Sequence, residues 1–173
     1  MSGSSGGFRL REPDAGDVER LARIHVQCWE QTYGTQLPPE FFGERAVEFR
    51  RRLWNRMVND SAPGSRTVVA ERGGEVVGFA SAGDPISPED PPPAGTELHM
   101  IYLLAEHHGS SAGQAMLDAV VGDRPAFLWV ATENSRAQAF YLRNGFALDG
   151  LEKPDERVPS FRESRMVRPD LTR

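Results

Sequence analysis

The pattern of apolar and polar positions at the start of the chain predicts a strand followed by two helices. FRLREP, from Phe8 to Pro13, alternates apolar and charged side chains as a half-buried strand does, and Asp14 offers an N-cap. Apolar residues then recur at helical spacing from Ala15 to Tyr33. A second helical stretch is expected from Glu40 to about Val58.

The middle of the chain predicts a hairpin, a loop and a buried strand. Residues 66–83 contain two β-rich runs around Gly73 and Gly74, which accept the positive φ of a tight turn. The prolines of residues 84–95 exclude a helix or a central strand, so this segment is expected to be a loop. TELHMIYLLA, residues 96–105, is expected to be a buried strand.

The last part of the chain predicts two helices and three strands. Residues 106–121 begin as a loop of small residues and become an amphipathic helix. AFLWVA (126–131) indicates a buried strand, NSRAQAFYLRNG (134–145) a helix, and GFALDG and SFRESRMV two final strands. The resulting order, β-α-α-β-β-β-α-β-α-β-β, indicates an α/β (α+β) fold whose central mixed sheet is flanked by helices.

Length and composition limit the classes of protein. With 173 residues and 39% apolar content, we expect one domain over residues 8–170, preceded by a disordered leader or cloning remnant over residues 1–7. A net charge of -5 disfavours nucleic acid and anionic membrane as partners and favours an amine-bearing small molecule. Cys28 is the only cysteine, and no apolar run approaches the length of a membrane span. We therefore expect a cytoplasmic protein.

The small-residue loop before residue 114 has the character of an anion site. Backbone N–H groups of such a loop can converge on a phosphate, aided by the positive end of the helix dipole. The loop has neither the Lys-Ser/Thr pair of a P-loop nor the glycine spacing of a dinucleotide fold. Plain packing of a short connection is the alternative explanation for its small residues.

Two motifs resemble the GNAT acetyltransferase superfamily. The segment His108-Gly109-Ser110-Ser111-Ala112-Gly113 is similar to that family's acyl-CoA-binding loop, R/Q-x-x-G-x-G/A after a buried strand. NSRAQAFYLRNGF is similar to its second signature, N-x-x-A-x-x-F-Y-x-x-x-G-F. The chain departs from the family at His108, where Arg or Gln is usual, and at Ser111, where glycine is usual. A positive φ at Ser111 would strain the loop.

This resemblance implies a GNAT-like, mostly antiparallel sheet and transfer of an acetyl group directly to an amine. Acetyl-CoA would be the cosubstrate, with no metal, and a homodimer would be compatible with the family. The resemblance also implies which residues contact the cosubstrate. They are the strand residues Ile101, Tyr102 and Leu103, the loop residues His108, Gly109, Ser110, Ser111, Ala112, Gly113 and Gln114, and Asn134, which is alternatively only an N-cap.

The resemblance also implies the catalytic and acceptor residues. Tyr141 would protonate the leaving thiolate, and ordinary aromatic packing beside Phe140 is the alternative. Glu97 would be the general base, or else a carboxylate facing solvent at a strand end, with His99 as the second candidate base. Trp29 and Tyr33 would contact the acceptor, the alternative for the tryptophan being a place in the core.

Other residue groups indicate no further chemistry. His25 and Cys28 lie three apart on a helix and are expected to be a buried pair. The basic run after residue 48 follows glutamates at helical intervals, which predicts a solvated face of ion pairs. The acidic loop residues Asp84, Glu89 and Asp90 could attract a cation.

The sequence thus predicts an acetyl-CoA-dependent N-acetyltransferase that acts on a primary amine of a small molecule or a peptide N-terminus. Two alternatives remain open at this point. One is a catalytically silent acyl-CoA-binding module, and the other is an interaction protein that retains only the scaffold.

Overall fold

The computed structural model describes residues 4–5, 7–86 and 91–170. The chain divides into two compact units, one made of Met1–Ser81 and Met100–Val120 and the other of Ala82–His99 and Val121–Arg173. Strands β4 (Glu75–Gly83) and β5 (Glu97–Leu103) contribute residues to both units. The single domain over residues 8–170 stays a prediction.

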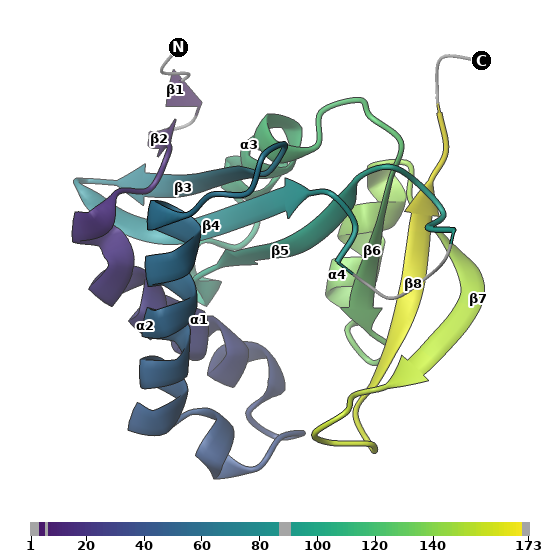
Figure 1. Cartoon of the computed structure of the whole chain (residues 1–173), viewed down its shortest axis with the longest axis horizontal. Coiled ribbons are helices and arrows are strands. Elements are labelled where there is room, and N and C mark those ends of the chain that lie inside the picture. The colour runs from purple at the N-terminus through teal and green to yellow at the C-terminus, as the bar shows by residue number, and fades with distance from the viewer. Residues whose placement is uncertain (1–3, 6, 87–90, 171–173) are drawn as a thin grey trace. The chain divides into compact units, whose positions relative to one another are not determined.

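The first unit contains three helices and a run of neighbouring strands (Figure 1). Its strand order is β1-β2-β3-β4-β5, with β1 at Ser4–Ser5, β2 at Phe8–Arg11 and β3 at Arg66–Arg72. The helices are α1 (Val18–Tyr33) and α2 (Glu44–Asn59), which pack against each other, and α3 (Ala112–Val120). Short 3-10 turns, η1 (Ala15–Asp17), η2 (Pro39–Phe41) and η3 (Ala105–His107), precede these helices.

Aromatic side chains fill the space between α1, α2 and the strands of the first unit. Trp54, Phe79 and Leu21 are fully buried, and the rings of His25, Phe79 and Tyr102 contact one another. Strands β4 and β5 approach closely at Gly78, where an added Cβ would lie 2.7 Å from the Tyr102 backbone oxygen. Only glycine fits this contact without a shift of the backbone.

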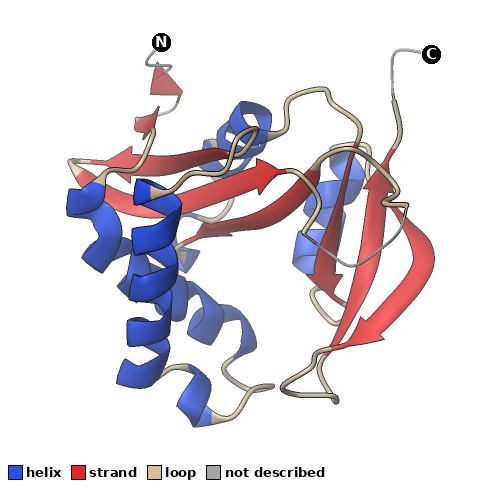
Figure 2. Cartoon of the chain, in the orientation of Figure 1, coloured by secondary structure: helices blue, strands red, loops and turns tan. Residues whose placement is uncertain are grey.

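The second unit is built on strands in the order β5-β6-β8-β7, and Figure 2 shows β6, β8 and β7 as neighbouring red arrows. Strand β6 spans Ala126–Ala131, β7 spans Ala147–Pro154 and β8 spans Arg162–Arg168, with α4 (Ser135–Arg143) between β6 and β7. Strand β8 is antiparallel to both β6 and β7, whereas β5 is parallel to β6. The sheet is therefore mixed and mostly antiparallel, which confirms the predicted fold class.

The boundaries differ from the sequence prediction where pairing overrides local signals. The hairpin turn is confirmed, because Gly73 and Gly74 have φ of +59° and +85°. The second helix begins at Glu44 rather than Glu40, because residues 39–41 form a 3-10 turn after Pro38. Strand β7 continues to Pro154, beyond the predicted GFALDG, because it pairs with β8 as far as Arg162.

Candidate active site

The predicted loop connects β5 to α3 in the first unit and contains no strained residue. Gly109 has φ of +79° with open space around its Cβ position, and no described non-glycine residue, Ser111 included, has a positive φ. The serine that departs from the family pattern is thus unstrained. Ser111 is exposed, and its backbone oxygen accepts the first bond of the helix from Ala115 N–H at 3.0 Å.

The start of α3 presents backbone donors. In any α-helix the first N–H groups have no partner in the preceding turn. The Ala112 N–H donates to the Ser110 Oγ at 3.3 Å, while the N–H groups of Ser111 and Gly113 have no acceptor within the described part of the chain. Donors of this kind, with the positive end of the helix dipole, favour a bound anion.

His108 ties this loop to β5. Its Nε2–H donates to the Leu103 backbone oxygen at 2.8 Å. The ring is therefore held beside the end of β5. On the other side, the Ala105 N–H donates to the Gln31 Oε1 of α1 at 3.0 Å. Ile101 and Leu103, the predicted strand contacts, are half-buried.

The two predicted acceptor residues, Trp29 and Tyr33, contact each other at the end of α1. Their ring centroids are 5.3 Å apart, and the Tyr102 ring of β5 lies 6.5 Å from that of Trp29. Tyr33 is buried, whereas Trp29 is half-buried. The alternative prediction, that Trp29 lies in the core, is therefore wrong. The Arg50 guanidinium lies over the Trp29 ring at 5.1 Å, and the buried Trp29 Nε1 has no hydrogen-bond partner among the described residues.

The predicted base, Glu97, lies in the second unit. Only 4% of this residue is exposed, which rules out the solvent-facing alternative. The loop after β4 covers it, because Ile86 N–H donates to the Glu97 Oε2 at 2.7 Å and the backbone oxygen of Asp84 accepts from His99 Nε2 at 3.0 Å. The other predicted acidic loop residues, Glu89 and Asp90, lie outside the described residues.

Tyr141 and Asn134 are both positioned by α4 in the second unit. The Asn134 Oδ1 accepts from Ala137 N–H at 3.1 Å, so the N-cap role is confirmed, whereas its contact with the cosubstrate stays a prediction. Tyr141 is 8% exposed and its ring packs against Phe140 and Phe146. Gly145, with φ of +83°, ends the helix and turns the chain back toward this ring.

Strand β6 has an edge that pairs with β5 at one position within the described chain, Glu97 with Phe127. The Phe127 N–H donates to the Thr96 oxygen at 3.0 Å, so alternation along the strand directs the N–H and C=O of Trp129 to the same edge. These Trp129 groups have no hydrogen-bond partner among the described residues. An extended ligand that carries amides could pair with them.

The remaining candidate groups have structural roles. His25 and Cys28 are buried as predicted, the His25 Nδ1 accepts from Trp54 Nε1 at 3.3 Å, and burial raises the pKa of the Cys28 thiol to about 12. The basic run on α2 forms ion pairs, including Arg52 with Glu48 at 3.0 Å. No group of three or more metal-ligating side chains occurs in the described ranges.

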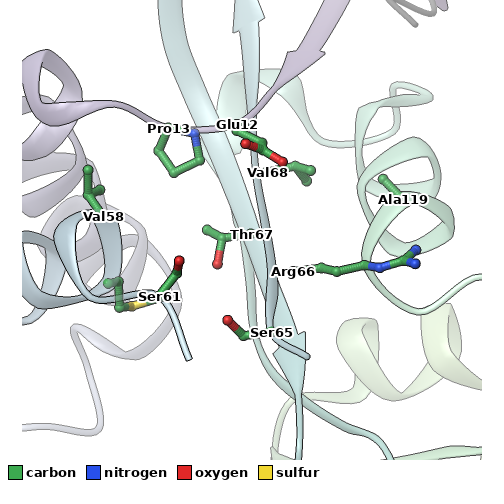
Figure 3. Close-up of a pocket in the computed structure, with 10 residues that line it drawn as sticks. Glu12, Pro13, Val58, Ser61, Ser65, Arg66, Thr67, Val68 and Ala119 are labelled. Atoms are coloured by element: carbon green, nitrogen blue, oxygen red, sulfur yellow. The ribbon is translucent and has the colours of Figure 1, made fainter. Parts of the chain in front are cut away.

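A cavity of about 380 Å³ lies elsewhere in the first unit (Figure 3). The end of α2, the start of β3 and the segment Glu12–Pro13 line it, and no predicted site residue does.

None of the described helices is long and apolar enough to cross a bilayer.

Sequence reasoning missed Trp129, Lys153 and Glu163, which lie together on β6, β7 and β8 of the second unit. One available signal was composition, because Lys153 is the only lysine in the chain. The proximity of these side chains depends on strand pairing, which spacing along the chain does not reveal.

Comparison with known proteins places this arrangement in a family. Residues 18–146 match the model of the acetyltransferase (GNAT) family. The chain is 31% identical over 132 residues to the uncharacterized N-acetyltransferase YuaI of Bacillus subtilis, covering 72% of each chain. It is 25% identical over 152 residues to a probable N-acetyltransferase of Mycobacterium tuberculosis, covering 83% of this chain and 82% of that one.

Solved structures show the same fold. The PaiA N-acetyltransferase of Thermoplasma acidophilum, determined in complex with coenzyme A, has a TM-score of 0.69 at 20% identity. The match covers 93% of this chain and 98% of that one. The family motifs, the match over residues 18–146 and the shared fold together establish that the chain belongs to the GNAT acetyltransferase family and is an acyltransferase.

Proposed function

We propose that the protein transfers an acetyl group from acetyl-CoA directly to a primary amine of a small molecule or a peptide N-terminus. The observation that carries this proposal is the unstrained loop from His108 to Gly113, which leads into α3 with backbone N–H groups that lack acceptors in the described chain. Acetyl-CoA would supply the thioester, and its pyrophosphate would bind at this loop.

The residues of each unit receive roles in this proposal. The N–H and C=O of Trp129 are suited to pair with the amides of the pantetheine arm, and Tyr141 is assigned to protonate the leaving thiolate. Glu97 is assigned to remove a proton from the acceptor amine, since a protonated amine has no lone pair for attack. Trp29 and Tyr33 are assigned to the acceptor.

Titration calorimetry with acetyl-CoA and with CoA tests the loop before any acceptor is known. Gly113→Asp separates binding from stability, because a carboxylate in the first turn of α3 stabilises the helix but repels a pyrophosphate. We expect this variant to bind at least about tenfold more weakly with an unchanged or raised melting temperature. Gly113→Asn is the matched uncharged control and should lose less affinity.

The outcomes also separate the alternatives. Micromolar binding together with thiol release from a panel of amines supports the transferase. Binding without turnover of any amine supports a silent acyl-CoA-binding module, and no binding leaves only a scaffold. Cytoplasmic location, a homodimer and the absence of nucleic-acid and membrane partners stay predictions.

A further inference from the structure

The only lysine of the chain has an unusual position on the second unit. Its twenty basic residues other than histidine comprise nineteen arginines and Lys153. The Lys153 Nζ lies over the Trp129 ring, 3.9 Å from its centroid. The Arg165 guanidinium is 6.0 Å from the same ring and is also held by Asp149, so the lysine is the closer cation.

Strand register places this lysine on the same sheet face as the candidate base. Lys153 pairs with Glu163, Glu163 pairs with Ala131, and Glu97 pairs with Phe127. Directly paired residues share a face, and so do alternate residues of β6, among them Trp129. The ammonium, the indole and two carboxylates therefore lie on one face of this sheet.

Glu163 is suited to accept a proton from this lysine. Its carboxylate is half-buried and has no hydrogen-bond or ion-pair partner among the residues that the structure describes. Burial raises the pKa of Glu163, while the cations Lys153 and Arg157 oppose the shift and the acids Asp155 and Glu97 add to it. A carboxylate whose pKa is raised is the stronger base.

Trp129 connects this cluster to the edge assigned to the cosubstrate. Its buried indole Nε1 has no hydrogen-bond partner in the part of the chain that the structure describes. Its backbone N–H and C=O point to the edge of β6 that pairs with β5 only at Phe127 within the same residues. Trp129 thus has two contacts to offer: its ring lies under the Lys153 ammonium, and its backbone could bind the pantetheine arm.

Resting on the proposed function, we propose that Lys153 is a self-acetylation site, modified by the protein's own transfer of an acetyl group from acetyl-CoA. A carboxylate of the cluster takes a proton from the ammonium, and the nitrogen lone pair forms a bond to the acetyl carbon. The carbon–sulfur bond breaks and its electron pair leaves with sulfur, and the second proton of the nitrogen passes to that sulfur to complete the CoA thiol. The products are a neutral amide at Lys153 and free CoA.

Intact-mass and peptide mapping of the full chain, incubated with acetyl-CoA and no added amine, test this proposal. We expect one added acetyl group, located on Lys153, at a first-order rate independent of protein concentration. Lys153→Arg keeps the cation but should gain no acetyl group in this peptide, and Glu163→Gln should be modified about tenfold more slowly. The control is urea-unfolded protein under the same conditions.

A second measurement needs no acetyl-CoA. Lys153→Met removes the ammonium from the Trp129 ring and should change the tryptophan emission, whereas Lys153→Arg should change it less. The same lysine substitutions in a Trp129→Phe background should leave the emission of the other two tryptophans unaltered. Equal emission of the wild type and Lys153→Met would contradict the ammonium–ring contact.

The results distinguish this inference from the proposed function. Absence of modification at Lys153 in a protein that binds acetyl-CoA and acetylates a free amine overturns the inference alone. Equal modification rates in folded and unfolded protein also overturn it, because the reaction is then uncatalysed. Failure to bind acetyl-CoA by calorimetry overturns both.

Discussion

The Nε2–H of His108 donates to the backbone oxygen of Leu103 at 2.8 Å, joining the loop before α3 to the last residue of β5. Members of the GNAT family that this loop resembles usually have Arg or Gln at this position. In this chain the imidazole of His108 instead forms a hydrogen bond with the protein's own backbone. The bond fixes the start of the loop, while the Gly109 φ of +79° provides its turn.

Loss of this bond should weaken cosubstrate binding. We expect His108→Ala to raise the Kd for acetyl-CoA by about two- to tenfold, because one hydrogen bond contributes about 0.5–1.5 kcal/mol. Calorimetry measures the change. His107→Ala is the matched control, since that ring packs on Phe8 instead and should leave the Kd unaltered. Equal Kd values for the wild type and His108→Ala would contradict a role for the bond in binding.

Removal of the Tyr141 hydroxyl should affect turnover and not binding. Tyr141→Phe retains the ring that packs against Phe140 and Phe146, so the melting temperature and acetyl-CoA affinity should stay nearly constant. We expect kcat to fall by about 100-fold or more if the hydroxyl protonates the thiolate. Thiol release under steady-state and single-turnover conditions measures this, and an unchanged single-turnover rate would remove Tyr141 from the chemistry.

Loss of the Glu97 carboxylate should slow transfer to the amine. Glu97→Gln keeps an oxygen that can accept the Ile86 N–H bond but cannot remove a proton from an amine. We expect kcat/KM to fall by about 100-fold or more at a fixed pH. Glu133→Gln, an exposed position in the same unit, is the control and should keep the wild-type kcat/KM. An unchanged kcat/KM in Glu97→Gln would transfer the role to His99 or water.

His25 should make stability depend on pH. Burial, with a smaller contribution from Arg50, lowers the pKa of His25 well below 6.5, so the folded protein keeps it neutral while the unfolded chain binds a proton. The free energy of unfolding should therefore fall as pH decreases below about 6.5, by up to about 1.4 kcal/mol per pH unit from this group. Urea unfolding between about pH 7.5 and 5.5 measures the slope.

Substitution isolates this contribution of His25. His25→Gln does not titrate and should show a shallower slope even if its absolute stability is lower. If the wild type and His25→Gln lose stability in parallel, the pH dependence originates in other groups.

The sequence by itself determined the order of helices and strands from Phe8 onward, the loop before α3 and the helix that carries Tyr141. These features depend on local signals: apolar periodicity, caps such as Asn134, and glycines such as Gly73 and Gly74 at turns that need positive φ. The family motifs are also local, because a backbone cradle and its helix occupy consecutive residues. Such features can be predicted without knowledge of distant contacts.

Only the tertiary structure decided the environments of single side chains. Glu97 is buried because residues 84–86 fold back over it, and Lys153 reaches Trp129 because β7 and β6 both pair with β8. Strand register and loop placement depend on contacts between residues far apart in the chain, and a shift of one residue would exchange the faces of a strand. The Lys153–Trp129–Glu163 cluster could therefore be found only after the strands were paired.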